Sequence, residues 1–183
     1  MTQRDTHTVK FAGLTRHLPL FEVAPGVKIA IFNMLGDTEV TQASAKALAK
    51  RLPKDAQVLL TAEAKSIPLV HALAVETGLP YVVLRKSYKP YMGNTVSAET
   101  LSITTGQPQT LYLDEKDIEL IHGRKVVIVD DVISTGSTLQ GMRLIIEKAG
   151  GSITATAAVF TEGERAQWKD IIALGHLPIF TTK

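Results

Sequence analysis

The chain has 183 residues, of which 45% are hydrophobic and 21% are charged, and its formal net charge is +2 at pH 7. This composition is typical of one globular domain, and the slight positive charge suits a small anionic ligand better than a nucleic-acid surface. The sequence has no cysteine, which excludes disulfides, thiol catalysis and cysteine-based zinc sites. Because no apolar run approaches the roughly 20 residues of a membrane span and the N-terminus lacks an apolar signal core, we expect a cytoplasmic protein without a membrane partner.

The first part of the chain alternates between strand-like and helix-like segments. Residues 18–32 suggest one or two short strands that a turn divides. Asp37 can cap a helix over residues 39–51, whose apolar residues recur on one face. A strand is predicted over residues 57–62, and a loop over residues 63–66 follows it.

A helix is predicted over residues 67–77, with Pro68 in its first turn and Gly78 directly after its end. A strand over residues 81–85 completes a strand–helix–strand unit, in which the two strands are expected to be parallel. The next stretch, 88–109, has little apolar pattern apart from a predicted strand at 99–104. Long loops of this kind in compact domains are either functional lids or disordered segments.

The most informative segment is 126–138, which reads V-V-I-V-D-D-V-I-S-T-G-S-T. Four β-branched residues predict a buried parallel strand that ends at two adjacent carboxylates, Asp130 and Asp131. A loop of hydroxyls and glycine then precedes an apolar-periodic helix. The N–H groups and the dipole of a helix N-terminus favour a phosphate, and adjacent carboxylates can accept hydrogen bonds from ribose hydroxyls. The simpler alternative is an ordinary strand-to-helix turn with two solvated acids.

The helix after residue 138 ends at Gly150-Gly151, and a strand over residues 152–160 gives a second strand–helix–strand unit. Such alternation predicts a parallel sheet covered on both faces. Ligands of these sheets bind at the carboxyl ends of the strands, where Glu63, Asp130 and Asp131 are all expected. Neither the lysine-bearing phosphate loop of nucleotide hydrolases nor the dinucleotide glycine fingerprint is present.

Segment 126–138 resembles the phosphoribosyl-diphosphate (PRPP) signature of type I phosphoribosyltransferases. The resemblance implies an α/β fold in a single domain over 1–183: a parallel twisted sheet with helices on both faces, a small hood and a flexible lid hairpin. It also implies that Asp130 and Asp131 are the catalytic acids that hold the ribose hydroxyls, and that Mg²⁺ arrives with PRPP and meets them directly or through water. The residues that would wrap the 5′-phosphate are Ser134, Thr135, Gly136, Ser137 and Thr138.

Two further segments resemble the pyrophosphate-binding parts of that family. Where adenine-specific members have E-x-R-G-F, this chain has Glu63, Ala64, Lys65 and Ser66, so lysine replaces arginine and serine replaces glycine. A non-proline cis peptide is expected here between Ala64 and Lys65. Considered without the resemblance, these segments would be an exposed loop and a solvated strand end. The cations that follow the strand at 81–85 are Arg85, Lys86 and Lys89.

In this family a hood covers the base and a hairpin closes over the reacting centre, which excludes water. The hood is expected from residues 18–32 and 160–183, and the lid from residues 88–109. Aromatic and apolar side chains in or near the hood could sandwich a planar base, although ordinary packing is the alternative. The candidates for this base pocket are Phe21, Phe32, Val132 and Phe160.

The resemblance implies a purine salvage enzyme, a homodimer, that transfers ribose 5-phosphate from PRPP to a purine base. The cation-rich segment and the Glu63 loop favour adenine, while xanthine and hypoxanthine-guanine remain alternatives and orotate is disfavoured. An alternative of another class is a regulator of the same fold that binds PRPP and nucleic acid without catalysis. Nucleic acid is not the expected partner, because the basicity is slight and few residues precede the first predicted strand.

Overall fold

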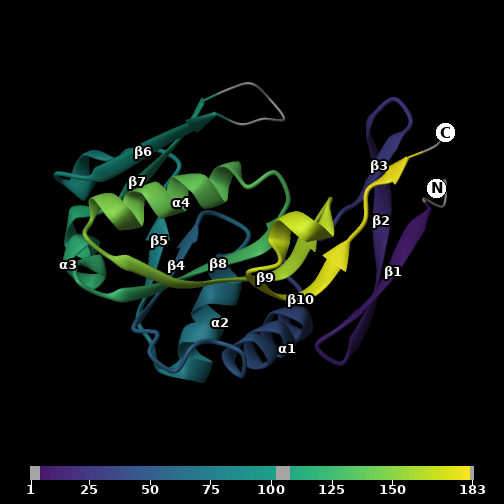
Figure 1. The fold of residues 1–183 in the computed structure, drawn as a ribbon, viewed down its shortest axis with the longest axis horizontal. Coiled ribbons are helices and arrows are strands. Elements are labelled where there is room, and N and C mark those ends of the chain that lie inside the picture. The colour runs from purple at the N-terminus through teal and green to yellow at the C-terminus, as the bar shows by residue number, and fades with distance from the viewer. Residues whose placement is uncertain (1–4, 102–107, 182–183) are drawn as a thin grey trace.

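The computed structural model describes residues 5–101 and 108–181, and Figure 1 shows how their helices and strands are arranged. Within these residues, the centre of the molecule is a five-stranded parallel sheet with the order β10-β9-β8-β4-β5. Its strands are β4 Val58–Ala62, β5 Tyr81–Leu84, β8 Lys125–Ile133, β9 Ser152–Glu162 and β10 Ile171–Leu177. Each of the first four overlaps a strand that the sequence predicts.

Helices cover both faces of this sheet. Helix α4, Ser137–Lys148, lies on one face, while α1, Thr38–Ala49, and α2, Ile67–Thr77, lie on the other (Figure 1). A shorter helix, α3 Ile118–Ile121, precedes β8. The predicted α/β class, a parallel sheet between two helical layers, is confirmed.

The sequence of β8 explains why both faces can be covered. Val127 and Val129 belong to the core cluster that contains α1 and α2, whereas Val126 and Ile128 belong to the cluster that contains α4. Side chains alternate between the two faces of a strand, so a continuous β-branched run gives each face apolar side chains to bury. This strand, which later carries the acids, is therefore fixed by packing on both sides.

Helix α1 begins where the sequence indicates. The Oδ1 atom of Asp37 accepts a hydrogen bond of 2.9 Å from the N–H of Val40, which satisfies one free donor of the first turn. The guanidinium of Arg16 pairs with the same carboxylate at 3.1 Å. Because Arg16 lies on a strand outside the central sheet, this ion pair also ties that strand to the helix.

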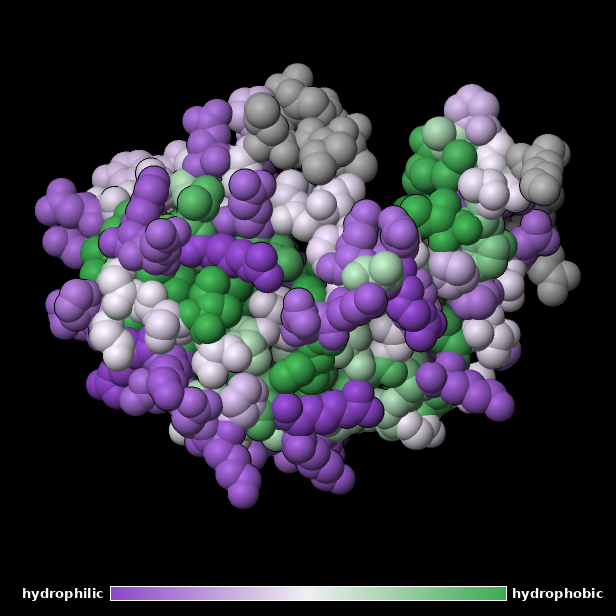
Figure 2. Space-filling view, viewed as in Figure 1, coloured by the Kyte–Doolittle hydropathy of each residue, from purple (hydrophilic) through white to green (hydrophobic). Residues whose placement is uncertain are grey.

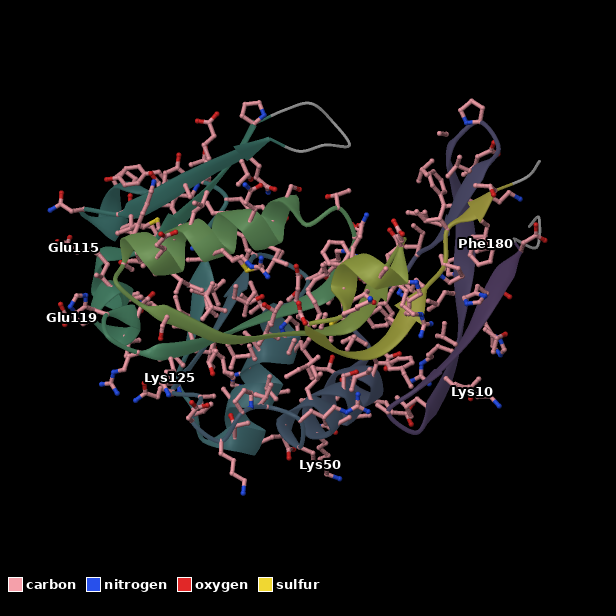
Figure 3. The ribbon with its side chains drawn as sticks, viewed as in Figure 1. Lys10, Lys50, Glu115, Glu119, Lys125 and Phe180 are labelled. Atoms are coloured by element: carbon pink, nitrogen blue, oxygen red, sulfur yellow. The ribbon has the colours of Figure 1, made fainter. Side chains whose placement is uncertain are left out.

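A second sheet, antiparallel and four-stranded, stands beside the parallel sheet and lies near both chain ends (Figure 1). Its strands, in sheet order, are β1 Thr6–Phe11, β2 Leu14–Ala24, β3 Val27–Ala30 and β11 Phe180–Thr181. The turn between β2 and β3 confirms the division expected within residues 18–32, but the sequence analysis did not anticipate β1. Figure 3 labels Lys10 and Phe180, which lie on this sheet.

A two-stranded hairpin packs against α4 (Figure 1). Strands β6, Val96–Leu101, and β7, Pro108–Leu113, are antiparallel, and the expected lid residues 102–107 lie outside the described part of the chain. The hairpin approaches α4 closely at Gly141, where a Cβ atom would lie 3.0 Å from Cδ1 of Leu111. The hairpin and the α4 layer therefore pack tightly against each other.

The residues expected to complete the hood divide between the two sheets. Strand β10 pairs in parallel with β9 and forms an edge of the central sheet, whereas β11 pairs with β3 of the antiparallel sheet. Gly175 permits this arrangement on β10, because a Cβ atom there would lie 2.6 Å from the ring of Phe160. No helix among the described residues is long and apolar enough to cross a membrane.

Candidate functional site

The two acids lie at the topological switch point of the central sheet. From β4 the chain passes through α2 to β5 on one side, and from β8 it passes through α4 to β9 on the other. Open α/β sheets bind ligands where the strand order reverses in this way, outside the carboxyl ends of the strands. Figure 2 shows the surface hollowed between the antiparallel sheet and the rest of the molecule.

Strand β8 differs from its predicted form at this point. The strand was expected to end at the two acids, but β8 continues to Ile133 because Asp130 and Val132 still pair with Ala158 and Phe160 of β9. On the other side, pairing between β4 and β8 stops at Ile128. The acids therefore lie where β8 remains joined to one neighbour and separates from the other.

Two residues of the loop that follows β4 contact this acid pair. The Ser66 hydroxyl donates a hydrogen bond of 2.7 Å to Oδ1 of Asp130 and accepts one of 2.9 Å from the N–H of Asp131. The Lys65 ammonium lies 3.3 Å from Oδ2 of Asp131. Asp131 is 5% exposed and Asp130 is half-buried, so the pair is sheltered but open on the Asp130 side.

Burial raises the pKa of Asp130 to about 7, and the neighbouring carboxylate of Asp131 adds to the rise. The hydrogen bonds from Ser66 and from the Asp131 N–H act in the opposite direction, because they stabilise the charged form. Near neutral pH, the site therefore holds less negative charge than two ordinary carboxylates would. A ligand that brings hydroxyl donors or positive charge would favour the ionised form of Asp130.

The predicted phosphate loop connects β8 to α4. Gly136 is the N-cap of α4 and has φ of +79°, a left-handed conformation that favours glycine. Thr135 and Ser137 approach each other through their hydroxyl oxygens at 3.2 Å. Asp130 and four of the loop residues line a small hollow of about 40 Å³, so the structure brings the loop and the acid together. These loop residues are Ser134, Thr135, Gly136 and Thr138.

Trp168, which no sequence motif singles out, packs against this loop. A Cβ atom on Gly136 would lie 3.2 Å from Cη2 of the indole, and the indole N–H donates a hydrogen bond of 2.8 Å to the carbonyl of Glu162. Trp168 ends a short 3-10 helix, Arg165–Trp168, between β9 and β10. Its only signal in the sequence is that it is the single tryptophan of the chain.

The other predicted cations lie elsewhere. Arg85 donates a hydrogen bond of 2.8 Å from Nε to Oε2 of Glu63, and the backbone N–H of Lys86 donates to the other oxygen of that carboxylate. Glu63 and Arg85 line a separate cavity of about 580 Å³ with Tyr91 and other residues beside the edge strand β5. Lys86 and Lys89 are exposed. Within the described chain, Lys65 and Ser66 meet the acids, whereas Arg85 pairs with Glu63 instead.

One detail of the loop after β4 corrects the sequence analysis. The cis peptide bond joins Glu63 to Ala64, one bond earlier than the predicted position between Ala64 and Lys65. Lys65 and Ser66 therefore follow the cis bond, and both of them contact the acid pair.

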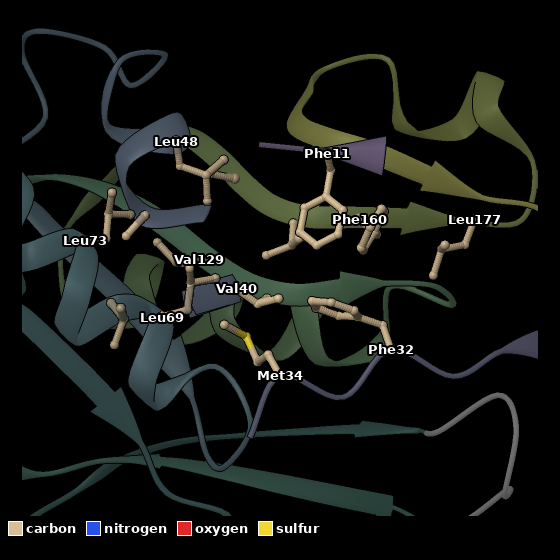
Figure 4. Packing of buried hydrophobic residues seen from close by; sticks show 14 of the residues in the cluster. Phe11, Phe32, Met34, Val40, Leu48, Leu69, Leu73, Val129, Phe160 and Leu177 are labelled. Carbon is tan, nitrogen blue, oxygen red and sulfur yellow. The ribbon is translucent and has the colours of Figure 1, made fainter. Parts of the chain in front are cut away.

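Three of the four candidate base-pocket residues lie together, and one lies apart. Phe32 and Phe160 are 5% and 1% exposed and pack edge to face with a centroid distance of 4.9 Å (Figure 4). Phe11, from the unanticipated strand β1, adds a third ring 4.8 Å from Phe160. Val132 is half-buried, pairs with Phe160 and packs against the same cluster. Phe21, in contrast, is 53% exposed on β2. The buried rings therefore join the antiparallel sheet to the central core.

No group of three or more His, Asp or Glu side chains among the described residues is placed to hold a metal ion.

The fold and the acid pair define a parallel α/β domain with a candidate ligand site at its switch point. Residues 33–176 match the profile of the phosphoribosyl transferase domain. The chain belongs to this family, which confirms the resemblance found in the sequence.

Several curated relatives are similar to parts of the chain. A hypoxanthine/guanine phosphoribosyltransferase of Methanocaldococcus sp. (strain FS406-22) is 40% identical over 111 residues, which cover 61% of this chain and 53% of that protein. The enzyme of the same name from Methanococcus vannielii is 31% identical over 85% of this chain and 76% of its own length. The purine biosynthesis transcriptional repressor PurR of Bacillus subtilis is 29% identical over 78% of this chain and 49% of its own length. The chain thus spans about half the length of the first and third of these relatives.

The fold is similar to solved adenine phosphoribosyltransferases. The structure from Thermoanaerobacter pseudethanolicus superposes with a TM-score of 0.71 at 25% identity, covering 87% of this chain and 95% of that chain. The structure from Rhodothermus marinus gives a TM-score of 0.65 at 21% identity over 94% of both chains. These likenesses confirm the arrangement of the sheet and its helices.

Proposed function

We propose that this protein is a purine phosphoribosyltransferase, which transfers ribose 5-phosphate from PRPP to a purine base and releases pyrophosphate. The observation that carries this proposal is the acid pair Asp130 and Asp131, which lies at the switch point beside the glycine loop that opens α4. Membership of the phosphoribosyl transferase domain family supports it. A homodimer is part of the same proposal.

The acids and the loop have separate roles in this proposal. Asp130 and Asp131 accept hydrogen bonds from the ribose hydroxyls, which fixes the sugar relative to the acceptor base. The loop 134–138 and the first N–H groups of α4 bind the 5′-phosphate. Positive charge develops on the ribose as its bond to pyrophosphate breaks, and the buried carboxylate of Asp131 stabilises that charge electrostatically.

Pyrophosphate, the leaving group, needs cations and N–H donors. Among the described residues, Lys65 is the cation that pairs with the acids, and its side chain is 51% exposed, so it can reach a ligand in the open part of the site. We also assign the backbone N–H groups of Glu63–Ser66 to the binding of pyrophosphate. Arg85, Lys86 and Lys89 complete this assignment, although Arg85 would have to exchange its contact with Glu63 for one with the ligand.

The acid pair also fits a magnesium ion that arrives with PRPP. Mg²⁺ prefers carboxylate oxygens and retains several waters, so one or two protein carboxylates are enough. Within the described residues, Oδ2 of Asp131 is buried and accepts no hydrogen bond, which leaves a lone pair for the ion or one of its waters. Asp130 and Asp131 would hold the ion, which would neutralise charge on the diphosphate.

Adenine is our first candidate for the base, because the Glu63 loop and the cations after β5 follow the adenine-type pattern. The relatives named hypoxanthine/guanine phosphoribosyltransferase favour those bases as the second candidate. The chain's similarity to a transcriptional repressor supports a third, non-catalytic reading in which PRPP is an effector.

One assay separates these candidates. The purified protein is given PRPP and Mg²⁺ with adenine, hypoxanthine, guanine or xanthine in separate reactions, and pyrophosphate release is measured. We expect release with at least one base and severe loss of release in Asp131→Asn. Binding of PRPP without turnover of any base, together with salt-dependent binding to nucleic acid, would instead support the regulatory function. Normal turnover by Asp131→Asn would refute the role of the acids.

A further inference from the structure

Ser66 has an unusual set of partners for its position. It is the N-cap residue of α2, and serine is among the residues that most often cap a helix with the side chain. Its hydroxyl nevertheless makes no capping hydrogen bond to α2. Instead the hydroxyl donates to Asp130 and accepts from the N–H of Asp131, and the residue is only 2% exposed. The hydroxyl therefore bonds to the acid pair instead of capping α2, although Asp130 lies 64 positions further along the chain.

These bonds connect two parts of the site that the sheet does not connect. Beyond Ile128, β8 no longer pairs with β4, so no ladder hydrogen bonds join the end of β4 to the acids. The hydrogen bonds and ion pair that join the described residues of these two strand ends come from Lys65 and Ser66. Lys65 is half exposed, whereas Ser66 is buried, so Ser66 is the more rigid of the two connections.

The hydroxyl also orients the carboxylate. Oδ1 of Asp130 accepts hydrogen bonds from the Ser66 hydroxyl at 2.7 Å and from the N–H of Asp131 at 2.9 Å. Two donors on Oδ1 fix the rotation of the Asp130 carboxylate. Its other oxygen, Oδ2 of Asp130, accepts no hydrogen bond within the described residues. A ligand hydroxyl can therefore be received by an oxygen that is already in place, which lowers the cost of ordering on binding.

We propose that Ser66 is a positioning residue, which joins the loop Glu63–Ser66 to Asp130 so that the two halves of the PRPP site form one unit. The inference rests on the proposed function, because it assigns that loop to pyrophosphate and the acids to ribose. It adds a role for Ser66, the serine that stands where the adenine-type pattern has glycine. Without the hydroxyl, only the N–H of Asp131 would hold Oδ1 of Asp130, and no hydrogen bond would join Asp130 to the loop, so PRPP would have to order the two parts of the site on binding.

The test compares side chains that differ in the hydroxyl. Thr and Val have nearly the same shape, so Ser66→Thr keeps the hydroxyl and Ser66→Val removes it, and Ser66→Ala gives the simple truncation. Ser44 is a matched control, since it is also a buried serine but its Oγ has no hydrogen-bond partner among the described residues. Affinity for PRPP is measured by titration calorimetry, and KM is measured separately for PRPP and for the accepted base.

We expect Ser66→Ala and Ser66→Val to weaken PRPP binding about tenfold, the scale of one lost hydrogen bond to a charged group, while KM for the base changes little. Ser66→Thr and Ser44→Ala should bind PRPP like the wild type. A purely structural serine would lower the melting temperature without this split between the two KM values. If Ser66→Ala does not fold, the Thr and Val pair still gives the comparison.

A double-mutant cycle identifies the partner. In an Asp130→Ala background, removal of the Ser66 hydroxyl should have no further effect on the dissociation constant of PRPP, because the group through which it acts is gone. Additive effects would overturn the inference, as would wild-type affinity in Ser66→Val. In both cases turnover by the wild type would leave the proposed function intact. A wild-type protein that neither binds PRPP nor releases pyrophosphate would overturn both.

Discussion

The ammonium of Lys65 lies 3.3 Å from Oδ2 of Asp131, a buried oxygen that accepts no hydrogen bond within the described residues. The lysine side chain is 51% exposed and the aspartate side chain 7% exposed, so the pair joins a mobile cation to a fixed anion. Arginine would grip a carboxylate with two parallel hydrogen bonds, whereas lysine acts as a compact point charge on a flexible stem. Lys65 can therefore turn from Asp131 toward a diphosphate without breaking a bidentate contact.

Lys65→Met should weaken the binding of PRPP. Only the lysine of this ion pair is half exposed, whereas the carboxylate of Asp131 is buried, so the variant leaves that carboxylate without its cation and the melting temperature should also fall. The affinity for PRPP should fall by about tenfold or more, because a diphosphate loses a nearby cation. Calorimetric titration with PRPP checks this. Lys50→Met is the control, since Lys50 points away from the site at the lower side of the molecule (Figure 3). Equal affinity in the two variants would contradict the role of Lys65.

Asp130→Asn should make the ligand-free protein more stable at alkaline pH while it abolishes turnover. Burial raises the pKa of Asp130 to about 7, whereas an ordinary aspartate has a pKa near 3.8. Between these values the folded protein retains a proton that the unfolded chain has lost, so the free energy of unfolding falls as pH rises through this window. Asparagine removes the effect, and the advantage of the variant should be largest at pH 8 and should vanish near pH 4. Melting temperatures across this range are the measurement, and a variant less stable than the wild type at pH 8 would refute the prediction.

The sequence predicts elements well where one local signal is enough. Helix α2 spans 67–77 as predicted, because Pro68 and Gly78 mark its two ends and apolar residues fill its length. Strand β1 was not predicted, since its six residues show alternation but follow a polar N-terminus and gain their burial only beside β2.

The site was predictable in its parts but not in its connections. Segment 126–138 indicated the acids and the loop, because the residue types and their order carry the chemistry. The bond from Ser66 to Asp130 depends on how far β4 and β8 separate after Ile128, which no local pattern encodes. The burial of Phe160 likewise follows from Phe11 and Gly175, two residues on strands that the sequence analysis did not predict.

Phe160→Leu should reduce stability without changing which base is accepted. The ring is 1% exposed and contacts the rings of Phe11 and Phe32, so a smaller side chain leaves unfilled volume in the core. We expect the free energy of unfolding to fall by about 1–3 kcal/mol. Denaturant titration measures the loss, and turnover with the four purine bases measures preference. A change of preferred base would instead support the assignment of Phe160 to the base pocket.

Asp37→Ala should destabilise the protein and leave the PRPP site unchanged. The substitution removes the cap of α1 and the partner of Arg16, and loss of a cap costs about 1 kcal/mol. The Arg16 guanidinium and the Val40 N–H hold the pKa of Asp37 below its ordinary value, so its contribution is present above pH 4 and is lost as the pH falls through the lower folded-state pKa. Melting temperatures measured from pH 7 downward should show the difference between the two proteins shrink as the Asp37 carboxyl takes up its proton. A difference that grows as the pH falls below 4 would contradict this explanation.

Trp168 should report binding at the phosphate loop by fluorescence. It is the only tryptophan of the chain, and its indole lies against Gly136, where a Cβ atom would approach Cη2 to 3.2 Å. A phosphate held by the N–H groups of the loop and the first turn of α4 brings negative charge close to this ring. Ribose 5-phosphate should therefore change the emission in a saturable way, whereas ribose without the phosphate should not. Gln167→Ala, in the same 3-10 helix, keeps the ring and should retain the response, while Trp168→Phe should lose it. An emission that PRPP and ribose 5-phosphate both leave unchanged, in protein that turns over PRPP, would place the phosphate away from this loop.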